Sequence, residues 1–331
     1  MSSSEDKKNT TNAYLFHGVD TFSSQKYLNF WKESFFKKYG ENANLEEHNA
    51  KEVNIKSIKL NIDSVPFLCD KRLIIIKDFF SVKKTDDQRE LAEIIENIPD
   101  HTIVIFYESK NAPKNLVLYK RLAKFGTVKE FAKTSPADAV KIIQETAKAK
   151  NSSIDSKTAT FLFQYLDGNM WNVFHETEKL SAFTDEITTN VIEDNVIQSL
   201  NSSIFKLTDA IGAKDAHSSL KVFKTLLNNG ESPIQIFFMI ARNFRIIIQI
   251  KELIEQGFNK NEIAKELKMN PFVAMQAMRP ARNFTFEKLK SIYKSILEID
   301  TKLKTGKIKT TVGNQTNYLI EIEMLIIDIC N

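Results

Sequence analysis

The sequence predicts an α/β domain with a parallel sheet, followed by two domains made only of helices. The first observation is the apolar run Leu73-Ile74-Ile75-Ile76, which lacks polar alternation and is typical of a strand covered on both faces. The second is that strand-like and helix-like segments alternate over residues 13–135, as in a parallel sheet wound with crossover helices. The third is a change at Pro136, after which only helical patterns follow.

Five short segments of the α/β domain are predicted to be strands. Ala13–Phe16 is the first, and Thr102–Tyr107 is apolar throughout. The segment 22–38 has apolar residues at helical spacing and ends before Gly40, a good helix stop. The predicted strands are 13–16, 45–49, 73–76, 102–107 and 127–131, and the predicted helices are 22–38, 53–62, 86–97 and 115–124.

The remainder of the chain divides at a polar break near Leu200–Ser203. We expect a small helical domain at 136–200, which begins with Pro136 in a first helical turn where proline is tolerated, and a second helical domain at 201–331. The predicted helices are 137–149, 156–166, 170–183 and 190–196, then 203–211, 216–228, 233–255, 259–267, 271–278, 285–305 and 316–330.

Composition and charge restrict the class of protein. The 331 residues are 42% hydrophobic, which is enough for the cores of two or three domains. The formal charge of +4, from 46 basic and 42 acidic residues, permits contact with nucleic acid without arguing for it. Cys69 and Cys330 form no disulfide framework, as in a reducing cytosol. The sequence has no run of about 18 apolar residues, so it predicts no membrane span. Residues 1–12 are expected to be a disordered tail.

The turn after the first strand lacks the residues of a phosphate-binding loop. Such a loop needs several glycines and a Lys-Ser or Lys-Thr pair. Here the turn, residues 18–26, retains Gly18 alone and places Asp20 and Phe22 where an anion would lie. The third strand ends in Lys77 and a single Asp78 instead of an acidic pair. We therefore expect that this domain does not hydrolyse ATP.

Other catalytic and cofactor sites are not indicated by the sequence. The five histidines are scattered without the spacing of metal ligands, and no Gly-x-Ser-x-Gly nucleophile turn occurs. We predict no catalytic residue, no metal and no cofactor.

One candidate binding element stands out, the turn Val65-Pro66-Phe67-Leu68 before the third strand. Pro66 cannot continue the preceding helix, so the large apolar side chains are expected at a loop that meets solvent. Physics alone leaves two interpretations. The side chains close the end of the core, or they are an anchor for another protein, because aromatic residues dominate interface energetics.

Short motifs occur along nearly the whole chain, and their order and spacing resemble those of a known family. They are YLFHGVDTF at 14–22, VPFLCDKRLIIIK at 65–77, LDGNM at 166–170, ETEKL at 176–180, IFKLTDAI at 204–211, GESP at 230–233, RNFR at 242–245, PF at 271–272 and DTKLKTG at 300–306. In this arrangement the chain resembles the delta subunit of the bacterial DNA polymerase III clamp loader.

The resemblance implies an ATPase-like (AAA+) parallel-sheet domain with a degenerate phosphate loop, a small helical lid domain and a C-terminal helical collar. It implies a non-catalytic subunit that binds and opens the sliding clamp for loading onto primed DNA during replication. It gives the clamp-binding role to Phe67, with Val65, Pro66 and Leu68 as neighbours. Some members have leucine where this chain has Pro66, which leaves open which neighbour completes the anchor.

The partners implied are the sliding clamp (the beta subunit), the gamma/tau and delta-prime subunits through the collar, and primed DNA within the assembly. The location implied is the cytoplasm, with the replication machinery at the nucleoid. Helix 233–255 is apolar on most sides and is expected to be buried in its own domain or against partner subunits. Its Arg242 and Arg245 are candidate contacts to DNA or to a partner subunit, with a structural ion pair as an equal alternative.

Two other functions compete with this one. The first is an ATP-hydrolysing enzyme with a divergent loop, whose turnover would depend on Lys26. The second is a module that binds DNA directly, which predicts a strong dependence of affinity on salt.

Overall fold

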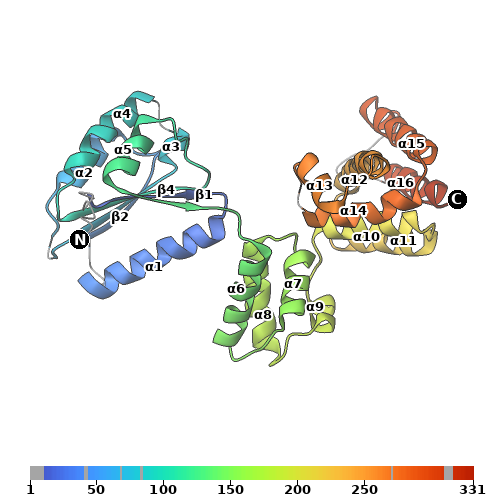
Figure 1. Cartoon of the computed structure of the whole chain (residues 1–331), viewed down its shortest axis with the longest axis horizontal. Helices are drawn as coiled ribbons and strands as arrows, with labels where there is room; N and C mark the ends of the chain where they lie inside the picture. The colour runs from blue at the N-terminus through green and yellow to red at the C-terminus, as the bar shows by residue number, and fades with distance from the viewer. Residues whose placement is uncertain (1–10, 41–43, 68, 83–84, 270, 309–315) are drawn as a thin grey trace, which may run out of the picture. The chain divides into compact units, whose positions relative to one another are not determined.

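The computed structural model describes residues 11–40, 44–67, 69–82, 85–269, 271–308 and 316–331. The chain forms two compact units, Met1–Ser135 and Pro136–Asn331 (Figure 1). Residues 1–10 of the predicted disordered tail lie outside the described residues, whereas Thr11 and Asn12 hydrogen-bond to Phe125 and Asp100 of the first unit. The division into a tail and three domains, with a boundary at about residue 200, stays a prediction.

The first unit contains a five-stranded sheet in the order β2-β3-β4-β1-β5, and every neighbouring pair is parallel. The predicted fold class, a parallel sheet wound with helices, is therefore confirmed. The strands are β1 (Ala13–Gly18), β2 (Asn44–Asn49), β3 (Arg72–Lys77), β4 (Thr102–Glu108) and β5 (Thr127–Phe131).

Helices cover both faces of this sheet (Figure 1). Leu73 and Ile75 of β3 pack with residues of α1 on one face, and Ile74 and Ile76 pack with residues of the other helices on the opposite face. This two-sided burial is the reason why β3 lacks polar alternation. The helices are α1 (Thr21–Tyr39), α2 (Ile55–Asp63), α3 (Phe79–Val82), α4 (Thr85–Ile94), η1 (Ile95–Asn97) and α5 (Val117–Phe125).

The second unit is helical in its described part, apart from one isolated bridge between Ser153 and Glu186. Its first helices are α6 (Pro136–Ala149), α7 (Ser156–Tyr165), α8 (Met170–Phe183) and α9 (Thr189–Asn195). Then follow α10 (Leu200–Gly212), α11 (Ala216–Asn228), α12 (Pro233–Glu255), α13 (Lys260–Glu266), α14 (Pro271–Asn283), α15 (Phe286–Lys304) and α16 (Thr316–Cys330).

Two helices extend at least three residues past a predicted end. Helix α10 begins at Leu200, where a break was predicted, because the Ser199 hydroxyl accepts the Ser202 amide (3.2 Å) and Ser202 and Ser203 are buried. Helix α14 continues past Met278 through Pro280, and buries Ala277 and Ala281 in the core. In both cases burial in the core overrides local preferences for turns.

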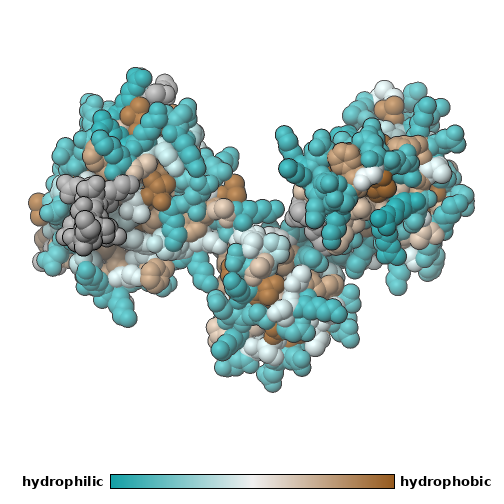
Figure 2. All heavy atoms as spheres, in the orientation of Figure 1, coloured by the Kyte–Doolittle hydropathy of each residue, from teal (hydrophilic) through white to brown (hydrophobic). Residues whose placement is uncertain are grey.

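Helix α12 is the long apolar helix of the C-terminal core. Its buried face includes Ile236, Phe237, Ile240, Phe244 and Ile247. By length and composition alone it is the one described helix that could cross a membrane, but this face packs inside the unit. Its apolar residues are therefore buried in its own domain along this face, which is one of the two alternatives that the sequence left open. Figure 2 shows mostly hydrophilic surfaces on the visible face, interrupted by small apolar areas.

Candidate clamp-binding turn

The turn between α2 and β3 exposes large apolar side chains. Val65 is 77% exposed and Phe67 is 74% exposed, whereas Pro66 is half-buried. Leu68, the fourth predicted site residue, lies outside the described residues. The side chains of Val65 and Phe67 therefore do not close the end of the core.

The backbone at Phe67 is held by a side chain of another element. The Phe67 amide donates to Asn44 Oδ1 (2.9 Å), and Asn44 Nδ2 donates to the Phe67 carbonyl (2.8 Å). Asn44 Nδ2 also lies 3.1 Å from Cys69 Sγ. The exposed ring therefore projects from a backbone that is fixed on both sides of its Cα atom. Sequence analysis missed Asn44, which lies 23 residues upstream and belongs to no motif.

The helix that leads into the turn is also fastened at its end. Arg72 Nη1 donates to the Asn61 carbonyl (2.8 Å), and Thr102 Oγ1 donates to the Ile62 carbonyl (2.8 Å). These carbonyls are among the last four of α2, which have no partner within the helix. The last turn of α2 also exposes Leu60 (68%). Exposed apolar residues thus both precede and form the turn.

The turn between β1 and α1 is occupied by the chain's own groups. Asp20 caps α1, because its Oδ1 accepts the Ser23 amide (2.9 Å) and its other carboxylate oxygen accepts the Thr134 hydroxyl. The N-terminus of a helix stabilises negative charge, and here the carboxylate of Asp20 supplies that charge. Gly18 is required by packing, since a Cβ atom there would lie 2.1 Å from the Phe131 carbonyl oxygen. Phe22 is buried.

The end of β4 carries a buried carboxylate that the sequence did not reveal. Glu108 accepts the Phe80 amide (2.9 Å) and the Ser81 hydroxyl (3.2 Å) at the start of α3. Burial raises the pKa of Glu108 to about 7. The two hydrogen bonds lower the pKa, but their effect is smaller than that of burial. Lys77, at the end of β3, pairs with Glu47 (2.6 Å) instead of with a second acid.

Glu108 predicts a pH dependence of the stability of the first unit. The folded chain binds more protons than the unfolded chain between the ordinary carboxyl pKa of 4.5 and the folded pKa of about 7. We expect the free energy of unfolding to rise on the order of 2 kcal/mol when the pH falls from 8 to 5. The variant Glu108→Gln, which does not titrate, should lose this rise.

Urea unfolding followed by tryptophan fluorescence measures this effect. The chain has two tryptophans, Trp31 in the first unit and Trp171 in the second, so Trp171→Phe isolates the first unit. Burial lowers the pKa of His17, which opposes the rise below pH 6.5, so the variant must be compared with the parent at each pH. Equal pH dependence of parent and variant would contradict the role of Glu108.

The two predicted arginines of α12 have partners within the chain. Arg242 Nη1 donates to Asn201 Oδ1 (3.2 Å), and Arg245 Nε donates to the Tyr293 hydroxyl (3.2 Å). Both side chains lie on the exposed side of α12, away from its buried face. They belong to the second unit, whereas the turn at Phe67 belongs to the first. Within the described residues, no group of three or more His, Cys, Asp or Glu side chains could hold a metal ion.

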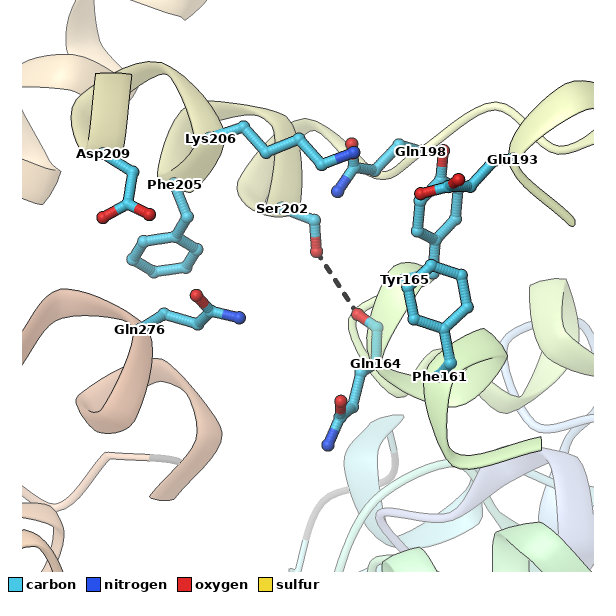
Figure 3. Close-up of a pocket in the computed structure, with 10 residues that line it drawn as sticks. All are labelled: Phe161, Gln164, Tyr165, Glu193, Gln198, Ser202, Phe205, Lys206, Asp209 and Gln276. Atoms are coloured by element: carbon cyan, nitrogen blue, oxygen red, sulfur yellow. Dashed lines mark hydrogen bonds between the residues drawn. The ribbon is translucent and has the colours of Figure 1, made fainter. Parts of the chain in front are cut away.

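A cavity of about 230 Å³ lies in the second unit between α7, α10 and α14 (Figure 3). Phe161 and Tyr165 form an aromatic wall, with Lys206 Nζ 5.3 Å from the Tyr165 ring centre. Ser202 Oγ donates to the Gln164 carbonyl (3.3 Å), and the Ser199 amide donates to the Tyr165 carbonyl (3.2 Å). The cavity is thus formed where the end of α7 joins the start of α10, and no nucleophile and base are paired in it.

Comparison with known proteins matches both units. The family model for "DNA polymerase III, delta subunit" matches residues 14–132, and the model for its C-terminal domain matches residues 201–321. The DNA polymerase III subunit delta of Bacillus subtilis is 28% identical over 307 residues, which are 89% of this chain and 88% of that protein. The probable delta subunit of Aquifex aeolicus is 22% identical over 302 residues, 87% of this chain and 84% of that protein.

A solved structure agrees in fold. The Bacillus subtilis DNA clamp loader delta protein superposes with a TM-score of 0.65 at 24% identity, and the match covers 97% of this chain and 96% of that one. Two family models that match parts of both units, and relatives similar over nearly the whole length, lead to one assignment. The chain belongs to the family of DNA polymerase III delta subunits.

Proposed function

We propose that this delta subunit binds the sliding clamp through the turn Val65–Leu68, with Phe67 as the main anchor. As a member of its family the chain is a clamp-loader accessory subunit that serves DNA replication and is not itself catalytic. The observation that carries the proposal is the exposure of Val65 and Phe67 on a hydrogen-bonded backbone. A few well-buried side chains supply most of the affinity of an interface, and aromatic residues are prominent among them.

The turn suits a small pocket on its partner. Fixed backbone geometry reduces the conformational entropy that binding would otherwise remove. The contact has a mechanical role and catalyses no reaction, because an anchor bound to the clamp helps to open one interface of the ring. ATP bound by neighbouring subunits would govern how often the anchor is presented, which is a shift in population.

We also propose that the first unit neither binds nor hydrolyses ATP. Asp20 supplies the negative charge at the N-terminus of α1, and Gly18 serves the packing of β1 against β5. A phosphate at this position would meet a carboxylate, and like charges repel. We expect no ATP turnover by the isolated chain above that of buffer, measured as phosphate release. Turnover that is lost on Lys26→Ala would contradict this and favour the enzyme alternative.

The C-terminal helical region, residues 201–331, is proposed to contact the gamma/tau and delta-prime subunits. Helix α16 carries an exposed apolar stripe at helical spacing, Ile320, Met324 and Ile327, which supports this. Arg242 and Arg245 are proposed to contribute to contacts with a partner or with primed DNA only secondarily, since each already has a partner within the chain. The subunit would act in the cytoplasm, with the replication machinery at the nucleoid.

The experiment is a titration of the full chain with the sliding clamp of the same organism, without ATP, by calorimetry. We expect a saturable one-site interaction. No binding at micromolar concentrations would contradict the proposed function. A parallel titration with duplex DNA tests the alternative of a direct DNA-binding module, which would require affinity that falls steeply with salt.

A further inference from the structure

We infer that Asn44 is the positioning residue of the clamp-binding turn, and that its side-chain amide sets the orientation in which Phe67 is presented to the clamp. The inference rests on the proposed function of the turn. The contact joins two elements that are distant in sequence, the first residue of β2 and the loop after α2.

The geometry is complementary on both sides of Phe67. Asn44 Oδ1 accepts the Phe67 amide at 2.9 Å, and Asn44 Nδ2 donates to the Phe67 carbonyl at 2.8 Å. The amide thus imitates the paired N–H and C=O groups of a neighbouring strand. Asn44 is itself held in the sheet, in register with Arg72 of β3. The turn is therefore attached to the edge strand of a five-stranded sheet.

This attachment matters because the Phe67 ring receives little support from the rest of the chain. With 74% of the residue exposed, packing of the ring does not determine where it points. The position of the backbone determines the direction of the ring, and at Phe67 the backbone is held by Asn44. Both contacts depend on the amide group of the side chain, because aspartate would lack the donor and would place an oxygen against the Phe67 carbonyl.

Loss of the contact should lower the fraction of molecules whose turn is ready to bind. The apparent dissociation constant rises in inverse proportion to that fraction. Two neutral hydrogen bonds of ordinary strength correspond to roughly a ten-fold change in that fraction. We therefore expect Asn44→Ala to weaken clamp binding about ten-fold.

The matched control is Asn49→Ala, at the opposite end of the same strand. Asn49 Oδ1 accepts the Lys51 amide (3.0 Å), so this variant also removes an asparagine and its backbone hydrogen bond, but away from the turn. Asn49→Ala should bind the clamp like the parent. The double variant Asn44→Ala/Phe67→Ala should bind no more weakly than Phe67→Ala alone, because Asn44 acts through the ring.

A second readout does not depend on the clamp. Hydrogen exchange of the Phe67 amide in the free full-length chain, followed by NMR, should accelerate in Asn44→Ala and remain unchanged in Asn49→Ala. Exchange in the interior of β3 should be the same in the parent and both variants. That comparison separates a local release of the turn from a general loss of stability.

The outcomes separate the inference from the proposed function. If Phe67→Ala weakens clamp binding but Asn44→Ala does not, or if their effects simply add, Asn44 does not position the ring. If Phe67→Ala has no effect, the proposed anchor is wrong, and faster exchange at Phe67 in Asn44→Ala would then still establish the structural contact. Unchanged exchange at Phe67 in Asn44→Ala would overturn the inference in every case.

Discussion

Phe67→Ala is expected to weaken binding of the sliding clamp by about 30- to 1,000-fold, which corresponds to about 2–4 kcal/mol. Phe67 is 74% exposed in the free chain, so truncation of its ring removes little packing energy from the fold. In the complex the same ring would be buried in a pocket, and its removal would leave that pocket unfilled. The effect should therefore appear in the affinity and not in the free energy of unfolding.

The control for this prediction is Phe183→Ala. Phe183 ends α8 and is 69% exposed, so the substitution removes a similarly exposed ring from the second unit, whereas the turn belongs to the first. Calorimetric titration of the clamp with the parent and both variants measures the difference, and circular dichroism checks that each variant is folded. Equal losses for the two variants would mean that general surface hydrophobicity, and not the turn, determines clamp binding.

Gly18→Ala is expected to destabilise the first unit by about 3–5 kcal/mol. The new Cβ atom would lie 2.1 Å from the Phe131 carbonyl oxygen, which belongs to β5 and cannot rotate away as a flexible side chain could. Gly18 also has a φ of +146°, which L-amino acids with a Cβ atom rarely adopt. The substitution should force β1 and β5 apart at the end of their pairing.

Gly40→Ala separates the steric cost from the cost of the backbone conformation. Gly40 has a φ of +92°, but a Cβ atom there would meet no atom within 4 Å. This variant should lose only about 1 kcal/mol. Urea unfolding followed by Trp31 fluorescence in the Trp171→Phe background measures both losses. A loss in Gly18→Ala no larger than that in Gly40→Ala would contradict a packing role for Gly18.

Much of the fold could be predicted because burial left clear patterns in the sequence. The run Leu73–Ile76 is apolar throughout because β3 is covered on both faces, and β5 and α8 have the predicted bounds. The misplaced boundaries have a common cause. At Leu200–Ser203 and at Pro280, residues that favour turns on their own lie in helices, since the helices bury neighbouring side chains.

The candidate site was predictable only in part. The side chains of the turn are apolar in sequence whether they fill the core or face solvent, so their role depended on the family resemblance. Asn44 and Glu108 could not be recognised, because their function depends on contacts with residues 23 and 28 positions away. Periodicity describes which face a residue occupies, but not which distant backbone group it meets.

Hydrogen–deuterium exchange of the full chain, with and without a saturating concentration of the sliding clamp, tests the central claim most directly. The account predicts that peptides covering residues 60–72 gain protection in the complex, and that α8, which carries the exposed Phe183, does not. Protection that appears only in the second unit, with residues 60–72 unchanged, would contradict the assignment of the clamp-binding turn.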